Sequence, residues 1–479
     1  MDVFIHSTSS FIWGWPLILL CIGVGILFTI ATKGVQIRYL KEMIRQISDT
    51  KSAKNGKGIS PFGALMLSLS GRLGTGNIAG VATAIAMGGP GAVFWMWLIA
   101  FLGAGSAFAE ATLGQIYKAR HEDGYRGGPS YYIEKGLGLR WYAVLYSLAI
   151  LLAYIIFLPG VQANTITTSM KQAFGFPPVL VGLAIVLSLV FLLRGGIKGF
   201  TKFSNIVIPV MTLGYLAVCF VIIALNIHRV PEVFGLIVSS AFGTHELFGG
   251  IVGYAISYGV RRGVFSTEAG QGSQVSAAAA AETSHPVKQG LVQSFSIYID
   301  TFLVNTATSF MILLTGAYNV LRPNNPDYLV ANIPSADYAS PAFTIYAVDS
   351  VFAGFGSAFI TIAVFFFVYT VFITYFYVAE TNLLYITKGK APKLLLWLMQ
   401  VIFLLVVFYG SVSDGNLAWA LADIGVGMAV WINLVALILL YKPVMRCFKD
   451  YEQAVKAKKE PRFHAKKLGI KNAEFWDDI

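Results

Sequence analysis

Two apolar stretches of the chain are interrupted by residues that disfavour a buried helix. The run 70–77 contains three glycines and Arg72, and the run 259–270 contains three glycines and several charged residues. A glycine costs about 1 kcal/mol relative to alanine inside a helix, and a charge at the centre of a bilayer costs at least ~2.5 kcal/mol. Backbone groups that a helix leaves unpaired in lipid must line a cavity or bind something. We therefore expect two unwound segments that form one binding site.

The chemistry available at such a site suits a carboxylate and a cation. The N-terminus of a half-helix presents amides to an anion, whereas C-terminal carbonyls suit a sodium ion. We expect the amides of Gly74, Thr75 and Gly76 near a carboxylate, with the side-chain oxygen of Asn77 as a candidate cation ligand. The alternative is that these glycines only allow two helices to pack closely. Paired breaks favour the binding hypothesis.

Ionisable side chains within the apolar stretches usually pair with one another or line a pathway. Eight of them lie away from the ends of the stretches: Arg72, Glu110, Arg261, Arg262, Glu268, Asp300, Glu380 and Asp423. We expect Arg72 to be neutralised by one of the acids. For Arg261, Arg262, Glu380 and Asp423, structural ion pairs are the preferred interpretation.

Uncharged polar residues also occur inside apolar stretches. Gln162 and Asn164 lie in one of them, and a buried amide costs several kcal/mol unless it is hydrogen-bonded. Such residues either tie helices together or face a ligand. Further polar positions follow in two later stretches: Asp300, Thr301, Asn305, Thr306 and Thr308, then Thr370, Thr374 and Glu380.

Composition and span lengths predict an all-α polytopic membrane protein. The chain is 56% hydrophobic and only 12% charged, about half the charge of a typical soluble protein. A membrane-crossing helix needs about 20 apolar residues. Eleven stretches approach or exceed this length: 11–32, 60–87, 91–117, 141–170, 178–194, 203–226, 247–281, 289–317, 353–387, 394–411 and 417–440.

The net charge of +11 reflects membrane topology and not nucleic-acid binding. Basic residues concentrate in alternate connections: 33–58, 118–140, 194–202, 388–393 and the tail from Lys442. This is the positive-inside pattern. It predicts a multi-pass protein of the cell (inner) membrane, in contact with the lipid bilayer, with its N-terminus outside and its C-terminus in the cytoplasm.

The interrupted stretches are the second and the seventh of the eleven, so they open two consecutive groups of five. Because five is odd, the second group enters the membrane from the opposite side, as in transporters built from inverted repeats. We therefore expect a 5+5 inverted repeat with one extra N-terminal helix. The predicted segments are 1–58 (extra helix and basic segment), 59–228 (first repeat), 229–441 (second repeat with extracellular loops) and 442–479 (cytoplasmic tail).

Several other classes of protein are disfavoured. Cys21, Cys219 and Cys447 are far apart, and all six histidines fall in connections or tails, so the apolar stretches hold no zinc, haem or catalytic cluster. We expect no enzyme activity and no cofactor beyond a co-transported ion. A channel would need a continuous pore with a filter or charged ring. A sensor built on a transporter fold stays open, as does the oligomeric state.

Several longer motifs carry a resemblance to a known family. The matching segments are 74–82 (GTGNIAGVA), 88–97 (GGPGAVFWMW), 126–129 (RGGP), 160–164 (GVQAN), 262–270 (RGVFSTEAG) and 285–293 (HPVKQGLVQ). From about residue 60 to beyond 430, the chain resembles the alanine or glycine:cation symporter (AGCS) family of bacteria and archaea, and is sodium:alanine symporter-like. The resemblance implies a leucine-transporter-like fold and sodium- or proton-coupled uptake of alanine or glycine.

The resemblance also implies roles for individual residues. The implied substrate-binding residues are Thr75, Gly76, Asn77, Gln162, Gly263, Phe265, Ser266 and Thr267. The implied sodium ligands are Ser70, Leu73 and Thr370. Apart from the resemblance, the intramembrane charges Arg72, Glu268 and Asp300 are the candidates for gating or charge pairing.

The chain departs from the family pattern at a few positions. Thr267 replaces a usual asparagine, Thr370 is followed by Val371 where family members often have a second hydroxyl, and 271–275 differs from the common sequence. A missing oxygen removes one cation ligand. We expect a secondary symporter that imports a small neutral amino acid with sodium by alternating access. A proton-coupled amino-acid symporter and a sensor without net flux are the alternatives.

Overall fold

The chain forms a mostly helical molecule with two small β-hairpins. The computed structural model describes residues 2–48, 58–122, 124–323, 325, 327–334 and 341–476, without the side chains of Arg194 and Lys198. Parts of all four predicted segments, 1–58, 59–228, 229–441 and 442–479, therefore lie outside the described residues.

Eight helices among the described residues are long and apolar enough to cross a membrane. They are α1–α2 (Asp2–Ile12 and Trp15–Ala31), α7 (Gly91–Ile116), α9–η3–α10 (Arg140–Leu151, Leu152–Phe157 and Leu158–Phe174), α12 (Gly196–Leu225), α16–η7–α17 (Pro286–Ile297, Tyr298–Asn305 and Thr306–Thr315), α19 (Gly356–Ile386), α20 (Lys393–Val412) and α21 (Gly415–Leu439). Two shorter apolar helices are η1–α6 (Gly76–Gly80 and Val81–Gly88) and α11 (Pro178–Leu192). The chain is a multi-pass membrane protein, and the total of eleven crossings stays a prediction.

The first interrupted helix consists of α5 (Pro61–Arg72), a short break and η1–α6. Ser60 caps α5 by accepting a hydrogen bond from the Gly63 amide at 3.0 Å, and Pro61 occupies the first helical turn, where its missing N–H costs nothing. The helix ends at Leu73, whose backbone is extended (φ −79°, ψ 93°). The break falls inside the predicted run 70–77.

The second interrupted helix consists of α14 (Val252–Thr267) and α15 (Val275–Ala280), and its break comes later than expected. The helix α14 is continuous through most of the predicted run 259–270, and the unwound segment is 268–274. Glu268 ends α14 in the left-handed region (φ 50°), followed by Gly270 (φ 89°) and Gly272 (φ 80°). Glycine adopts positive φ angles without the steric cost that other residues incur, so Gly270 and Gly272 favour an unwound segment here.

The interrupted helices are packed at the centre of the molecule and the remaining helices surround them. In the most apolar 18-residue segment of α19, 78% is buried within the protein, against 28% in the corresponding segment of α20. Large apolar side chains of α20, α11 and α12, such as Leu405, Leu187 and Leu213, are exposed. In a membrane protein such side chains face lipid, so α20, α11 and α12 form the periphery.

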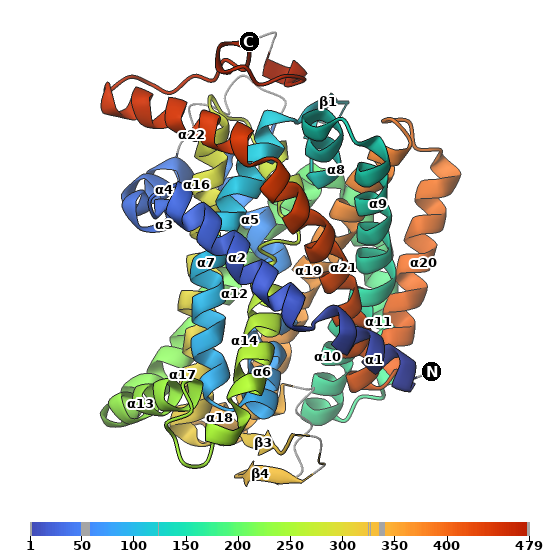
Figure 1. Cartoon of the computed structure of the whole chain (residues 1–479). Coiled ribbons are helices and arrows are strands. Elements are labelled where there is room, and N and C mark those ends of the chain that lie inside the picture. The colour runs from blue at the N-terminus through green and yellow to red at the C-terminus, as the bar shows by residue number, and fades with distance from the viewer. Residues whose placement is uncertain are drawn as a thin grey trace.

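The other elements lie mainly at the two ends of the bundle (Figure 1). They are α3 (Val35–Arg38), α4 (Leu40–Ile47), α8 (Pro129–Tyr132), η2 (Ile133–Leu137), η4 (Leu193–Gly195), η5 (Ile227–Arg229), α13 (Val230–Ala241), η6 (Gly249–Ile251), α18 (Ala342–Asp349), α22 (Tyr441–Lys456), η8 (Lys466–Leu468), η9 (Glu474–Trp476), and the antiparallel hairpins β1–β2 (Ala119–His121 and Gly124–Arg126) and β3–β4 (Asn319–Leu321 and Tyr328–Ala331). Helices α4, α8 and α22 lie at one end, and α13, α18 and β3–β4 lie at the other.

Backbone hydrogen bonds join the two interrupted helices at the end near α8. The residue before α5, Ile59, donates to the carbonyl of Ala280 at 3.0 Å and accepts from the amide of Glu282 at 2.9 Å. After each interrupted helix, four further long helical segments follow in the chain: α7, α9–α10, α11 and α12, then α16–α17, α19, α20 and α21. This order agrees with the count behind the 5+5 repeat, and symmetry between the halves stays a prediction.

Candidate functional site

The first break is held by its own side chain and leaves one hydroxyl unused. The amide of Gly74 donates to Asn77 Oδ1 at 2.9 Å, and the amide of Asn77 donates to the carbonyl of Gly74 at 3.2 Å. Thr75 is 1% exposed, and its Oγ1 has no hydrogen-bond partner among the described residues. An unpartnered buried hydroxyl costs free energy, so a ligand that bonds to Thr75 would stabilise this segment.

The first break lies directly against the second interrupted helix. A Cβ added to Gly76 would lie 3.3 Å from Phe265 Cδ1 and 3.3 Å from Ser266 Cα. That separation is tighter than an ordinary contact, so an added carbon would require η1 or α14 to shift by a few tenths of an ångström. Asn77 Nδ2 also donates to Ser266 Oγ at 3.3 Å. The start of η1 and the last turn of α14 therefore form one junction.

Asp300 of η7 is the hub of the polar network at this junction. Its Oδ1 accepts from Asn77 Nδ2 at 2.7 Å and from Ser266 Oγ at 2.9 Å, and its Oδ2 accepts from Thr301 Oγ1 at 2.7 Å. Asn305 joins the same network by donating to Ser266 Oγ at 2.9 Å and accepting from Asn77 at 2.7 Å. All five side chains are buried, and their oxygens are of the type that Na⁺ prefers.

Gln162 of α10 reaches the first break. Its Nε2 donates to the hydroxyl of Tyr375 at 3.1 Å. Its Oε1 has no hydrogen-bond partner in the described part of the chain, and lies 3.5 Å from the position that a Cβ on Gly74 would take. An acceptor oxygen is thus directed at the break, where the ammonium group of a ligand would bond to it.

A second polar layer lies around Glu268, where α14 ends. Its carboxylate accepts hydrogen bonds from Tyr154 at 3.3 Å, from Ser273 at 2.8 Å and from Gln274. A Cβ on Gly71 would lie 3.2 Å from Glu268 Oε2, so this carboxylate contacts the end of α5. Like the Asp300 network, this layer connects the two interrupted helices.

A third group of oxygens lies between α5 and α19. Thr370 Oγ1 donates to the carbonyl of Ser70 at 3.3 Å, and Ser70 Oγ lies 2.6 Å from Thr374 Oγ1. Thr374 is one helical turn beyond Thr370 and provides a second hydroxyl although Val371 follows Thr370. Val371 instead packs on Gly74, where an added Cβ would lie 2.6 Å from Val371 Cγ2. Ser70 and Thr370 are thus in contact, whereas Leu73 makes no contact with Thr370 among the hydrogen bonds of the described residues.

The ion pair expected for Arg72 does not form. Within the described residues its guanidinium donates to the carbonyl of Gln293 at 3.2 Å and to Ser296 Oγ on α16, and it has no carboxylate within 4.0 Å. Asp300 and Glu268 accept hydrogen bonds from neutral donors instead. The structure therefore shows no direct pair, and the neutralisation of Arg72 by one of the acids stays a prediction.

Gly263 and Thr267 make packing and local backbone contacts. A Cβ on Gly263 would lie 2.4 Å from Ile99 Cγ2, so this glycine allows α14 to pack against α7. Thr267 Oγ1 donates to the carbonyl of Gly263 at 2.8 Å and accepts from the amide of Ala269 at 3.3 Å. Gly263 therefore serves the packing of α14 on α7, and the hydroxyl of Thr267 is bonded within its own segment.

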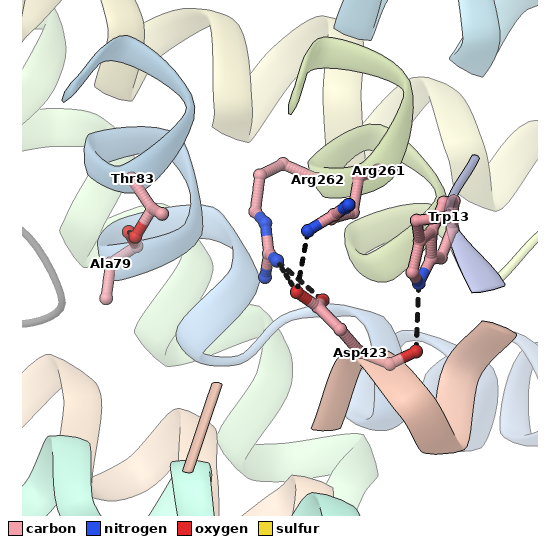
Figure 2. A network of polar contacts seen from close by, with 6 residues as sticks. All are labelled: Trp13, Ala79, Thr83, Arg261, Arg262 and Asp423. Atoms are coloured by element: carbon pink, nitrogen blue, oxygen red, sulfur yellow. Dashed lines mark hydrogen bonds and ion pairs between the residues drawn. The ribbon is translucent and has the colours of Figure 1, made fainter. Parts of the chain in front are cut away.

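The four charges expected to form structural pairs do so: Arg261, Arg262, Glu380 and Asp423. Asp423 of α21 accepts from Arg262 at 2.5 Å and lies 3.5 Å from Arg261, both on α14. Figure 2 shows the two guanidinium groups converging on this carboxylate, while the indole of Trp13 donates to the Asp423 carbonyl at 2.8 Å. Glu380 pairs with Arg126 at 3.2 Å.

Sequence reasoning did not assign four residues that the structure brings to the site. Asn305 and Thr374 were noted as polar positions in apolar stretches, but their spacing alone did not show that they face the breaks. Tyr154 and Tyr375 were not noted, because an aromatic residue in an apolar helix usually indicates core packing. A buried tyrosine hydroxyl usually has a hydrogen-bond partner, so these two tyrosines could have been considered as polar contacts of the site.

Interrupted helices that meet in a buried polar site, within a multi-pass helical membrane protein, define the class of secondary transporters. The comparisons with known proteins agree. The family model of the Sodium:alanine symporter family matches residues 1–465. The chain belongs to this family, and it is a transporter and not an enzyme.

Two similar relatives carry names that include alanine. The putative sodium/proton-dependent alanine carrier protein YrbD of Bacillus subtilis is 49% identical over 477 residues, covering 100% of this chain and 98% of that protein. The sodium/proton-dependent alanine carrier protein of Bacillus sp. PS3 is 47% identical over 439 residues (91% and 97%). The probable sodium/glutamine symporter GlnT of B. subtilis is 39% identical over 477 residues (99% and 96%).

Among solved structures, MhsT in complex with L-phenylalanine matches with a TM-score of 0.55 at 13% identity, covering 87% of this chain and 96% of that chain. The manganese transporter of Eremococcus coleocola matches with a TM-score of 0.51 at 14% identity (87% and 90%). These likenesses establish a leucine-transporter-like fold. Because the two structures belong to transporters of different solutes, the fold does not identify the substrate.

Proposed function

We propose that the protein is a secondary active symporter that imports a small neutral amino acid, of the alanine or glycine class, together with Na⁺. The observation that carries this proposal is the junction of the two interrupted helices. Backbone amides near Thr75 and Gly76 suit the substrate carboxylate, and the unpartnered oxygens of Thr75 and Gln162 suit its ammonium group. The names of the alanine carriers among the relatives support the choice of substrate.

A short side chain fits the spacing of the junction best. Gly76 lies so close to Phe265 and Ser266 that a single added carbon would be crowded on two sides. In this proposal the substrate side chain lies against the ring of Phe265, and a long side chain would force η1 and α14 apart. Asn77 and Ser266 complete the substrate site, and Gly263 and Thr267 support it by positioning α14 against α7.

Sodium is the proposed coupling ion, and the oxygens between α5 and α19 are its proposed site. Ser70 and Thr370 were implied by family resemblance, and Thr374 adds a hydroxyl beside them, with Leu73 supplying a carbonyl at the end of α5. The Asp300 network offers a second, anionic set of oxygens. A cation bound there would also offset the charge of the buried carboxylate.

Proton coupling is the second candidate, because buried carboxylates lack ion pairs. Neither Glu268 nor Asp300 has a basic group within 4.0 Å among the described residues, and a carboxyl group in such a place either binds a cation or takes up a proton. The names of two relatives include both sodium and proton.

Alternating access between the two ends of the bundle completes the proposal. In this proposal the halves 59–228 and 229–441 are inverted repeats, so each half opens the site to one side of the membrane. The N-terminus lies outside and the C-terminal tail lies in the cytoplasm. The inner membrane is the proposed location. Closure at the end near α8 is supported by the backbone bonds that join Ile59 to Ala280 and Glu282.

The test is uptake by the purified protein in proteoliposomes, with labelled alanine, glycine, serine and glutamine offered in turn. Gradients of Na⁺ and of pH are imposed separately. The proposal expects alanine or glycine to accumulate when Na⁺ is higher outside, with no requirement for a pH gradient. Accumulation that follows the pH gradient and ignores Na⁺ would replace sodium with a proton. Binding without accumulation under any gradient would favour a sensor.

A further inference from the structure

A pocket opens at the end of the bundle that carries α4, α8 and α22, and its lining shares no residue with the junction of the two breaks. It lies between the hairpin β1–β2, the segment α8–η2, the start of α9 and the last residues of α19 (Figure 1). Its volume is about 270 Å³, the share of roughly nine water molecules at about 30 Å³ each, which exceeds the volume of a phosphate group. The topology predicted from the sequence places this end in the cytoplasm.

The lining of this pocket is strongly basic. Among the described residues that line it, one charged side chain is acidic, Glu134, and five are basic: Arg120, Arg126, Lys135, Arg140 and Lys388. Like charges gathered in one pocket repel one another, and a bound anion relieves that repulsion. The excess of cations therefore favours an anionic ligand.

Arg126 and Lys135 hold the walls of the pocket in place. Arg126 is buried, donates to Thr381 Oγ1 at 2.8 Å and pairs with Glu380 at 3.2 Å. Lys135 pairs with Glu474 of η9 at 2.8 Å. These contacts connect β2 to α19 and η2 to the C-terminal tail. Both side chains are engaged, so they give the pocket its shape and part of its charge.

Arg140 and Lys388 are the two cations that solvent reaches and that have bonding capacity left. The side chain of Arg140 is 51% exposed, and its contact with Glu134 is 4.0 Å long, which is beyond hydrogen-bond distance. Glu134 also accepts a hydrogen bond from the hydroxyl of Tyr385. Lys388 is exposed, and its ammonium group makes no hydrogen bond or ion pair with the described residues. One of these two cations comes from each predicted repeat.

The surface beside the pocket has the character of a membrane interface. Trp141, which follows Arg140 on α9, and Trp397, in the second turn of α20, are both more than half exposed. Exposed tryptophans gather at the level of the lipid headgroups. Leu145 and Leu148, one and two turns further along α9, are exposed as well. The surface thus changes from charged to apolar along α9, in the order of the phosphate and the acyl chains of a phospholipid.

We propose that this pocket binds the phosphate group of an anionic phospholipid from the cytoplasmic leaflet. The phosphate accepts hydrogen bonds from Arg140 and Lys388, and the acyl chains lie along Leu145 and Leu148. Basic pockets at the cytoplasmic side of membrane helices suit such headgroups. A headgroup that carries its own ammonium would bring a further cation into the pocket and is disfavoured. The site goes beyond the proposed function, because it needs the predicted orientation but neither the substrate nor the coupling ion.

A bound headgroup would also join the two halves of the protein at this end. Arg140 belongs to the predicted repeat 59–228, and Lys388 belongs to the predicted repeat 229–441. A ligand that binds only the folded protein stabilises it. The lipid should therefore raise the Tm of the protein in detergent.

Native mass spectrometry of the full-length protein in detergent tests the proposal. The protein is titrated with phosphatidylglycerol, or with phosphatidylcholine of the same acyl chains. We expect the wild type to bind phosphatidylglycerol in preference. The variant R140Q/K388Q should bind it about twentyfold more weakly, because each basic residue near a headgroup contributes to the attraction. The matched control is K449Q/K456Q, which removes two exposed lysines of α22 at the same end but outside the pocket, and its affinity should equal that of the wild type.

Thermal unfolding separates a lipid from a soluble phosphate. Phosphatidylglycerol should raise the Tm of the wild type and of K449Q/K456Q but not of R140Q/K388Q, and millimolar inorganic phosphate should raise none of them. If R140Q/K388Q does not fold, K388Q takes its place and should bind phosphatidylglycerol about fivefold more weakly.

Three results would overturn the proposal. They are equal binding of the two lipids, an equal loss of binding in the control and in R140Q/K388Q, and a Tm that responds to inorganic phosphate but not to phosphatidylglycerol. None of these measurements uses an amino acid or a Na⁺ gradient, so their failure would leave the proposed symport untouched.

Discussion

Replacing Asp300 by asparagine tests the polar hub with the smallest change of shape. In the wild type the carboxylate accepts three hydrogen bonds, from Asn77, Ser266 and Thr301, at 2.7–2.9 Å. Asparagine keeps one oxygen, which can still accept from Asn77 and Ser266. The other oxygen becomes an NH₂ group, so the Thr301 hydroxyl must turn and accept instead of donating.

The expected magnitude follows from these three bonds. A hydrogen bond to a charged group contributes about 1.5–3 kcal/mol, and a neutral one about half of that. Losing the charge on three bonds therefore costs about 2–4 kcal/mol at the site. If this energy holds η1, α14 and η7 in the form that binds substrate and cation, the apparent affinity falls by roughly 30- to 1,000-fold, at about 1.4 kcal/mol per factor of ten.

The assay is the Na⁺ dependence of alanine uptake by proteoliposomes that contain D300N. We expect uptake to fall, with a higher Na⁺ concentration needed for half-maximal rate. The control is D349N, because Asp349 also accepts a close hydrogen bond, from the Gly356 amide at 2.7 Å, but lies at the end of α18 and takes no part in the Asp300 network. Wild-type uptake and Na⁺ dependence in D300N would refute the reasoning.

Three further predictions concern other contacts. In G76A the new Cβ would lie 3.3 Å from Phe265, so alanine uptake should fall at least tenfold while expression and size-exclusion profile are kept; normal uptake would show that the junction has spare room. T374V removes the hydroxyl that lies 2.6 Å from Ser70 Oγ, and should raise the Na⁺ concentration for half-maximal uptake severalfold. An unchanged Na⁺ dependence in T374V would contradict the proposed sodium site. W476A removes a buried ring of the C-terminal tail and should destabilise the protein by about 3 kcal/mol, measured as a lower Tm in detergent, with transport retained; an unchanged Tm would contradict the packing of the tail.

Much of the fold followed from local features of the sequence. The apolar lengths predicted a helical membrane protein, and the glycines and charges at 70–77 located the first break, because the cost of such residues in a lipid-exposed helix is large. The second break was placed too early. The arginines at 261 and 262 do not interrupt α14, since Asp423 pairs with them, and the left-handed backbone at Glu268 determines where the helix ends.

The side-chain directions at the site could not be predicted from the sequence. Gly263, Phe265 and Ser266 belong to one motif, but the motif does not show that Gly263 packs on α7 whereas Phe265 and Ser266 pack on Gly76. The close contacts of Arg72, with the Gln293 carbonyl and Ser296, depend on how α5 and α16 pack and were not predictable from the sequence. The role of Thr374 was not predicted, because a second hydroxyl was expected directly after Thr370. The structure places that hydroxyl one helical turn further along, on Thr374.

The central claim is that the two breaks form one shared site, and a density map of the protein with bound alanine and Na⁺ tests it most directly. We expect the alanine carboxylate within hydrogen-bond distance of the amides near Thr75, its ammonium group near Gln162, and its methyl group against Phe265. Density that contacts only one of the two interrupted helices, or that lies elsewhere in the molecule, would contradict the account.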